Sequence, residues 1–264
     1  MMDIEFLIKT FERKDCLERL LLSLEKFYPK YPIIIVDDSE EFDKKFYKQF
    51  NLNIRILHVG YDVGLSYGRN VGWQQSDKKY ICLLDDDFVF TEKTDIEKLY
   101  KIAESTGAGV VAGSLQNVRK VDGYDYNLVI RDNTLFYEKG KENWEKYKGI
   151  EYRQSEIVYN FGLFRVEMLK EHSWDNFIKI KGEHSDFFLR LKETEWQALY
   201  VPEVVVKHIP VRDRHYNEKR SRNQYLAYMM KKHNIKTIVS PSGTMTELIN
   251  NKIITGKKYE SDNN

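Results

Sequence analysis

The feature that most constrains the fold is a run of four β-branched residues, Ile33-Ile34-Ile35-Val36. A strand with one face in solvent alternates apolar and polar residues, whereas a strand covered on both faces of a parallel sheet is apolar throughout. The run therefore predicts an inner strand of a sheet that carries helices on both faces. Other short apolar runs resemble it, at 4–8, 54–59, 80–84 and 108–112.

Segments with helical periodicity separate these runs. Apolar residues recur every three or four positions in 14–27 and again in 96–103, and 66–75 begins with a serine suited to cap a helix. Strands that alternate with helices predict an α/β fold, in which right-handed crossovers build a mainly parallel sheet.

The second half of the chain changes character. Residues 123–138 alternate like an antiparallel hairpin with a turn at 131–133. The Lys/Glu-rich segment 139–153 is predicted to be a surface loop or short helix, and the polar chain from 240 onward a loose tail. Between them the pattern predicts a helix, a strand and a basic amphipathic helix, at 187–191, 198–206 and 218–232.

Charge and composition exclude several classes of protein. The chain has 42 Lys and Arg against 41 Asp and Glu, a net charge of +1, whereas a dedicated nucleic-acid binder is normally strongly basic. We therefore expect no nucleic-acid partner. No apolar run is long enough to cross a bilayer, no secretory leader is apparent, and two cysteines make no disulfide framework. A cytoplasmic setting is expected, with the basic segment 212–232 as a peripheral contact to the membrane.

Conspicuous polar residues follow four of the predicted strands. They are Thr10 and Arg13, the Asp37-Asp38-Ser39 group, the segment 60–70, and Asp85-Asp86-Asp87. Ligands of an open parallel sheet bind beyond the carboxyl ends of its strands. Four independent strand ends thus predict one site at that edge.

The aspartate triplet indicates a divalent cation. Three adjacent carboxylates repel one another unless a cation compensates them, and Asp85 and Asp87 can face one ion while Asp86 points elsewhere. Oxygen ligands that leave positions open suit Mg²⁺ or Mn²⁺ bridging a diphosphate, and His208 could complete the shell. The alternative is an acidic turn that caps the next helix.

Three other segments carry candidate functional groups. Gly64 and Arg69 begin a helix whose amides and guanidinium suit a phosphate, although such glycines often serve only a turn. The run 182–186 offers Glu183, His184 and Asp186 as general bases, or as an acidic helix cap. The basic residues of 212–222 could meet a diphosphate, an anionic acceptor or lipid headgroups, or form a solvated helix face.

In this order the motifs resemble the GT-A glycosyltransferases of family 2 type. The string Asp85-Asp86-Asp87-Phe88-Val89-Phe90 is similar to that of ganglioside-type β-1,4-N-acetylgalactosaminyltransferases and their bacterial relatives, and the resemblance covers roughly residues 3–209. It implies a Rossmann-like GT-A fold with a small antiparallel region on the acceptor side. The expected divisions are a catalytic domain 1–210 with a nucleotide-sugar half 1–115 and an acceptor half 116–210, a basic helical extension 211–239 and a polar tail 240–264.

The resemblance also implies roles for site residues. Asp85 and Asp87 would be the D-x-D pair that holds Mn²⁺ or Mg²⁺, with His208 as the later metal ligand. Gly182-Glu183-His184 departs from the usual Gly-Glu-Asp, so the base is assigned in the order Asp186, Glu183, His184. Donor-binding roles, with Asp37 or Asp38 reading the base or ribose, fall to Thr10, Arg13, Asp37, Asp38, Gly64, Arg69, Asp85 and Asp86.

The implied activity is metal-dependent, inverting transfer from a UDP-sugar, with GalNAc, GlcNAc or Gal favoured, to a hydroxyl of a glycan or lipid-linked glycan acceptor. Synthesis of a surface polysaccharide or glycoconjugate is the implied setting. The alternatives are a nucleotidyltransferase on a similar sheet and a non-catalytic module that binds nucleotide-sugar or glycan. Candidates for stacking on the acceptor are Tyr124, Tyr126, Trp144 and Trp174.

Overall fold

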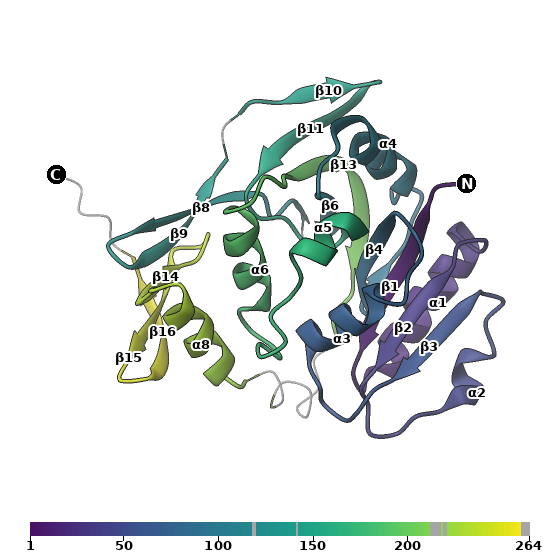
Figure 1. Ribbon diagram of the computed structural model, residues 1–264, viewed down its shortest axis with the longest axis horizontal. Helices are drawn as coiled ribbons and strands as arrows, with labels where there is room; N and C mark the ends of the chain where they lie inside the picture. The colour runs from purple at the N-terminus through teal and green to yellow at the C-terminus, as the bar shows by residue number, and fades with distance from the viewer. Residues whose placement is uncertain (118–119, 141, 212–217, 219–220, 260–264) are drawn as a thin grey trace.

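The computed structural model describes residues 1–117, 120–140, 142–211, 218 and 221–259. Its centre is a large mixed sheet (Figure 1). The strand order is β10 (Glu145–Tyr147), β11 (Ile150–Ser155), β13 (Ala198–His208), β6 (Val110–Gln116), β12 (Gly162–Arg165), β4 (Tyr80–Asp85), β1 (Ile4–Thr10), β2 (Ile33–Asp37) and β3 (Ile54–His58). Two short strands, β5 (Phe88–Val89) and β7 (Val121–Asp122), pair with β13 and β6.

The apolar run that constrains the fold lies in β2, and both of its faces are buried. Ile33 and Ile35 belong to one core cluster, whereas Ile34 and Val36 belong to a second cluster that also contains Trp73. Because successive side chains of a strand point to opposite faces, the sheet has a core on each side. The first core includes residues of α1 (Lys14–Phe27), α2 (Lys44–Tyr47) and α4 (Ile96–Thr106), and the second includes residues of α3 (Leu65–Trp73), α5 (Val166–Glu171) and α6 (Glu183–Leu191).

The expected α/β architecture is confirmed, and the large sheet includes an inner antiparallel strand that the sequence pattern did not reveal. Strands β4, β1, β2 and β3 are parallel, and Thr10, Asp37 and His58 align in register at their carboxyl ends. Strand β12 runs antiparallel between β4 and β6. A Cβ at Gly162 would lie 2.6 Å from the Val111 carbonyl oxygen, so glycine permits the close approach of β12 to β6.

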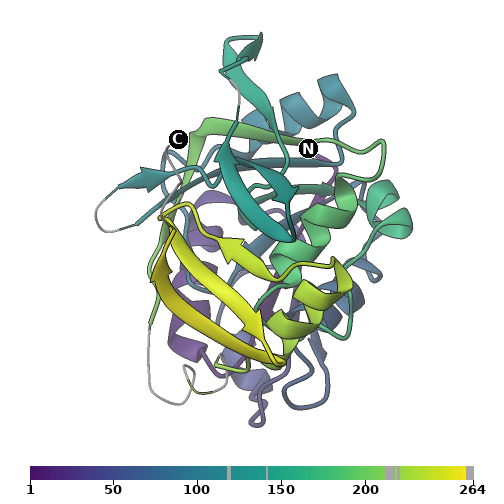
Figure 2. The same cartoon turned by 90° about the vertical axis from the view of Figure 1, so that its left-hand side faces the viewer.

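A second sheet lies beside the first, on the left of Figure 1 and facing the viewer in Figure 2. The predicted hairpin belongs to this sheet, as β8 (Tyr126–Arg131) and β9 (Thr134–Lys139). Its turn residues, Asp132 and Asn133, both have positive φ and lie within the predicted turn at 131–133. Helix α8 (Gln224–Lys232) lies within the predicted basic helix 218–232 and packs against β16 (Lys252–Lys258) of this sheet. The strand order is β16 (Lys252–Lys258), β15 (Thr244–Ile249), β14 (Thr237–Val239), β9 (Thr134–Lys139) and β8 (Tyr126–Arg131).

Two expectations about irregular segments were wrong. Residues 244–258 are no loose tail, because β15 and β16 form a hairpin whose turn residues, Asn250 and Asn251, have positive φ. Within 139–153, β10 and β11 form another hairpin through the turn at Lys148 and Gly149. In both cases turn residues with positive φ separate short strands, and neighbouring strands supply the hydrogen bonds that polar composition alone does not reveal. No helix in the described residues is long and apolar enough to span a membrane.

Candidate active site

A pocket of about 380 Å³ opens at the carboxyl ends of β1 and β2. Asp37 is fixed at its wall, since Oδ1 accepts from the Ser39 amide at 2.9 Å and Oδ2 from the Tyr47 hydroxyl at 2.6 Å. Burial and this carboxylate raise the pKa of Tyr47, so the hydroxyl stays a donor. The side chains that line the pocket include Thr10, Arg13, Leu17, Asp37, Phe46 and Tyr47.

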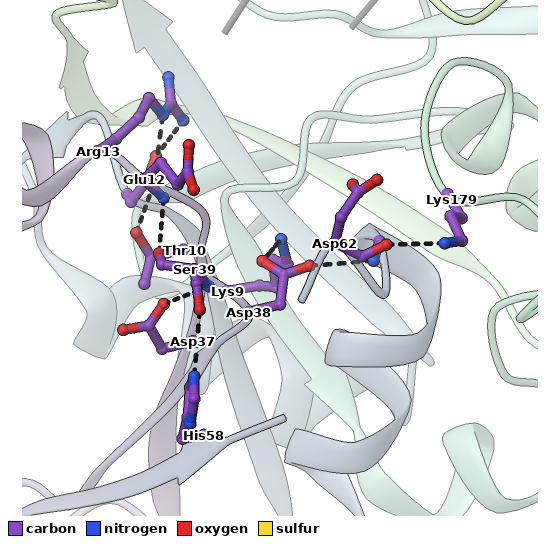
Figure 3. Close-up of polar contacts among 12 residues, drawn as sticks. Lys9, Thr10, Glu12, Arg13, Asp37, Asp38, Ser39, His58, Asp62 and Lys179 are labelled. Atoms are coloured by element: carbon purple, nitrogen blue, oxygen red, sulfur yellow. Dashed lines mark hydrogen bonds and ion pairs between the residues drawn. The ribbon is translucent and has the colours of Figure 1, made fainter. Parts of the chain in front are cut away.

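Asp38 does not line this pocket, although it was grouped with Asp37 as a donor-binding residue. It is fully buried, forms an ion pair with Lys9, and accepts the Gly64 amide at 3.0 Å (Figure 3). Gly64 itself has φ of 98°, and a Cβ there would lie 2.6 Å from the Cα of Lys179. Asp38 therefore fixes the loop that precedes α3, and it does so from inside the protein.

The central aspartate of the triplet, Asp86, anchors Arg13. Thr10 donates its hydroxyl to Asp86 at 2.8 Å, and Arg13 contacts both Asp86 carboxylate oxygens. Burial raises the pKa of Asp86 to about 6, against the opposing effect of Arg13. Asp86 and its neighbour Asp87 both bind the Arg13 guanidinium, so they do not face apart, and Asp86 holds this basic side chain at the pocket.

Asp87 and His208 meet at the other side of Arg13. The Arg13 Nη1 nitrogen donates to Asp87 Oδ2 at 2.9 Å, and His208 Nε2 lies 3.5 Å from the same oxygen. The second ring nitrogen of His208 lies 2.8 Å from the side-chain oxygen of Asn117, the kind of contact that orients metal-binding histidines. Asn117 was missed in the sequence, because the pairing of β6 with β13 places it beside His208, and the pairing of β5 with β13 brings His208 to the triplet.

The expected three-ligand metal set is not assembled. Asp85 lies against Arg69, whose Nη2 donates to Asp85 Oδ1 at 3.3 Å. In the described part of the chain, no three His, Cys, Asp or Glu side chains are grouped closely enough to hold a metal ion. Asp87 and His208 nevertheless fit Mn²⁺ or Mg²⁺ as a two-residue oxygen and nitrogen donor pair that leaves positions for a diphosphate.

Arg69 connects the triplet to the start of α6. Its guanidinium is buried, and its Nη1 lies 3.9 Å from Glu183 Oε1. Among the described residues this Nη1 has no hydrogen-bond partner, although it is buried. Arg69 thus presents an unused donor between two carboxylates, Asp85 and Glu183, which is a position suited to a polar ligand.

The three candidate bases have very different surroundings. Asp186, which was ranked first, is fully buried and bound to Arg190 at 2.9 Å, Lys232 at 2.8 Å and His233 at 2.9 Å. Although burial opposes it, these partners hold the pKa of Asp186 well below its usual range. A carboxylate so strongly stabilised is a poor proton acceptor and serves instead to join α6 to α8.

His184 is also unsuited to the role. Its Nδ1 lies 2.9 Å from the Asn160 side-chain oxygen, and its ring lies near those of Tyr124 and Phe188. Burial, together with the charge of Arg69, lowers the pKa of His184 to about 3. The third candidate, Glu183, has its carboxylate beside Arg69, which also contacts Asp85 of the triplet.

The aromatic residues expected to stack on the acceptor also differ in exposure. Trp174 is buried and stacks on Phe187 with a centroid distance of 4.7 Å, so the expectation that it contacts an acceptor was wrong. Trp144 is exposed and lies over the guanidinium of Arg153. Tyr124 and Tyr126 are half-buried neighbours with centroids 5.3 Å apart.

Of the basic residues predicted to follow His208, the structure describes Arg222, which binds Asp62. The others named in the sequence, at 212, 214, 215, 219 and 220, lie outside the described residues.

Residues 6–170 match the sequence model of glycosyl transferase family 2. The chain belongs to this family. The matched region contains the pocket and the aspartate triplet, whereas Glu183 and His208 follow it in the chain, so their position near the triplet comes from the structure.

Relatives support the assignment to the family. The chain is 29% identical over 194 residues to the mouse protein named beta-1,4 N-acetylgalactosaminyltransferase 2, a match that covers 69% of this chain and 34% of the relative. It is 36% identical over 116 residues to mouse beta-1,4 N-acetylgalactosaminyltransferase 1, covering 44% of this chain and 20% of that protein. With Streptococcus pneumoniae glycosyltransferase GlyG it shares 32% identity over 120 residues, covering 44% and 38% of the two chains. The matches thus span well under half the length of these relatives.

The fold is that of GT-A glycosyltransferases. The crystal structure of S. aureus TarS superposes with a TM-score of 0.58 at 14% identity, covering 88% of this chain and 43% of that one. A shorter TarS structure, of residues 1–349, gives a TM-score of 0.55. The GT-A architecture expected from the motifs is therefore confirmed.

Proposed function

We propose that this family 2 protein transfers a sugar from a nucleoside diphosphate sugar to an acceptor hydroxyl, with inversion at the anomeric carbon. One observation carries the proposal. The side chain of Arg13 lines the pocket at β1 and β2 and also binds Asp86 and Asp87, beside His208. A nucleoside site and a diphosphate site are thereby adjacent, as a nucleotide-sugar requires.

The nucleoside is assigned to the pocket of about 380 Å³. Its fixed carboxylate, Asp37, can accept an N–H of a base or a ribose hydroxyl, and Phe46 and Tyr47 give an apolar wall. We propose UDP as the nucleotide. GalNAc, GlcNAc or Gal is the proposed sugar, a choice supported by two relatives named N-acetylgalactosaminyltransferases.

Asp87 and His208 are proposed to hold Mn²⁺ or Mg²⁺. When bound there, the cation supplies positive charge to the departing diphosphate. Arg13 places a guanidinium beside the same phosphates, because Asp86 fixes it from behind. Arg69 offers its unused Nη1 to the sugar or to a phosphate oxygen. Asp85 is assigned to the orientation of Arg69, and its role as a metal ligand remains a prediction that the diphosphate complex would test.

Glu183 is the proposed general base. It lies beside Arg69, whereas Asp186 is held in a network of ion pairs and burial lowers the pKa of His184. Glu183 would take the proton from the acceptor hydroxyl as that oxygen attacks the anomeric carbon. The bond to the diphosphate breaks on the opposite face, which gives inversion.

The acceptor is proposed to be a glycan or lipid-linked glycan, with exposed Trp144 and the neighbouring pair Tyr124 and Tyr126 as candidate stacking surfaces. Synthesis of a surface polysaccharide or glycoconjugate, by an enzyme in the cytoplasm that touches the membrane through 212–232, completes the proposal.

The central claim can be tested by thermal unfolding with UDP, GDP and ADP, each with and without Mn²⁺. We expect UDP with Mn²⁺ to raise the midpoint, since a ligand that binds the folded state stabilises it. Asp87→Asn should abolish the contribution of Mn²⁺. If no nucleotide raises the midpoint of the unmodified protein in the presence of metal, the proposal is wrong.

Catalysis is tested separately from binding. The rate of sugar transfer or donor hydrolysis should fall about 10²–10⁴-fold in Glu183→Gln while UDP binding persists. Nucleotide binding without turnover in the unmodified protein, across UDP-GalNAc, UDP-GlcNAc and UDP-Gal, would instead indicate a binding module.

A further inference from the structure

A small cavity adjoins the proposed diphosphate site and is bordered by several basic side chains. It has a volume of about 40 Å³, and its walls include Lys9, Arg13, Lys179 and Arg222. Asp62 and Asp86 also border it. Arg13 lines both this cavity and the larger pocket, so the two spaces share a wall.

Most of these basic groups already form ion pairs or hydrogen bonds within the protein. Lys9 is buried in an ion pair with Asp38, and Arg13 is bound to two carboxylates of the triplet. Lys179 donates its Nζ to the backbone carbonyl of Asp62 at 2.8 Å (Figure 3). Arg222 is paired as well, with Asp62 on the cavity wall, but it reaches the cavity from the segment before α8 and is more exposed than Arg13, 25% against 9%.

The contact between Arg222 and Asp62 is bidentate. Nη1 and Nη2 of Arg222 donate to the two carboxylate oxygens of Asp62 at 2.6 and 2.8 Å. The backbone of Asp62 is held independently, since its amide donates to the Asp38 carbonyl at 3.0 Å and its own carbonyl accepts from Lys179. The loop can thus keep its shape when the carboxylate loses its partner.

We propose that Arg222 is a second phosphate-binding arginine of the donor site, and that Asp62 holds it until a nucleoside diphosphate takes the place of the carboxylate. The inference rests on the proposed function. The planar guanidinium fork that binds a carboxylate binds a phosphate in the same way. Both side chains keep some solvent contact, 25% for Arg222 and 17% for Asp62, so a ligand from solvent can reach the ion pair.

This arrangement makes Asp62 a competitor of the donor. Substitution of Arg222 and substitution of Asp62 should therefore change diphosphate affinity in opposite directions. A purely structural ion pair predicts the same direction for both, because either substitution would loosen the same contact.

The test is calorimetric titration of UDP and of uridine, both with Mn²⁺, into the full chain and its variants. Arg222→Gln should weaken UDP binding about 10-fold or more, since it removes a charge-assisted contact. Asp62→Asn should strengthen UDP binding about 2- to 5-fold, which is the range of a partly exposed ion pair. Uridine, which has no phosphate, should bind all variants alike.

Two further variants keep the test decisive. Arg222→Lys retains the charge without the fork, and should lie between the unmodified protein and Arg222→Gln. Arg131→Gln removes an exposed arginine that pairs with Glu138 in the second sheet, and should leave both titrations unchanged. Weaker UDP binding in Asp62→Asn, or a parallel loss of uridine affinity in Arg222→Gln, would overturn the inference. Failure of UDP to bind the unmodified protein would instead overturn the proposed function.

Discussion

Replacement of Asp186 by Asn separates a structural carboxylate from a catalytic one. Asp186 is fully buried and accepts from Arg190, Lys232 and His233. Removing one partner of a buried ion pair costs about 3–5 kcal/mol, because the remaining charge stays buried without compensation. We expect Asp186→Asn to be destabilised chiefly for this reason.

The geometry places the expected cost somewhat below that range. Lys232 also pairs with Asp175 at 2.7 Å, and Arg190 donates to the Ser173 carbonyl at 2.8 Å, so both cations keep another partner. Each is about a quarter exposed, and water can reach it. A loss of about 2–3 kcal/mol follows, which corresponds to a fall in melting temperature of about 4–12 °C for a domain of this size.

The assay pairs urea unfolding with initial rates, and Glu183→Gln serves as the matched variant. Asp186→Asn should lower the free energy of unfolding and keep most of its turnover when assayed well below its melting temperature. Glu183→Gln should show the converse, near-normal stability with turnover reduced about 10²–10⁴-fold. If Asp186→Asn kept full stability and lost turnover to that extent, Asp186 would be the base and the assignment of Glu183 would be refuted.

The pH dependence supplies an independent check. The basic partners hold the pKa of Asp186 below its value in the unfolded chain, so the folded state gains stability from this group above the unfolded pKa. That stability is lost as pH falls through about 4 and toward the folded pKa. The difference in unfolding free energy between the unmodified protein and Asp186→Asn should therefore shrink from pH 6 to pH 3. A constant difference would contradict the ionic origin of the effect.

Three other outcomes are expected. Asn117→Ala should lower the affinity for Mn²⁺, measured in the presence of UDP, about 10- to 100-fold, because His208 loses the group that orients its ring. Unchanged Mn²⁺ affinity would argue against His208 as a metal ligand. Gly64→Ala should cost more than about 1 kcal/mol in urea unfolding, since alanine is strained at positive φ and its Cβ would meet Lys179, and a neutral result would show that the loop can move. Truncation after Ser240 should lower the melting temperature or solubility, because it removes β15 and β16 with the core contacts of Leu248 and Ile253, whereas an unstructured tail could be removed without effect.

Much of the fold was predictable because local patterns report burial directly. The apolar run in β2 required helices on two faces, and the Asp132-Asn133 turn indicated its hairpin. Strand β12 was harder to predict, since a short apolar segment does not reveal which neighbours it inserts between. The C-terminal hairpin was missed for a different reason, because its composition is polar and an Asn-Asn pair such as Asn250-Asn251 does not by itself specify a turn.

The sequence by itself determined the edge of the sheet at which the site lies, since parallel strands bring Thr10, Asp37 and Asp85 to one side whatever their partners are. The role of each side chain was decided by the tertiary structure. Asp186 is bound by His233, 47 residues away, and Asp38 is held inside the protein by Lys9 and Gly64. A carboxylate becomes a ligand, a base or an anchor according to the charges and solvent around it. Those surroundings come from distant segments, so neighbouring residues in the sequence could not distinguish Glu183 from Asp186.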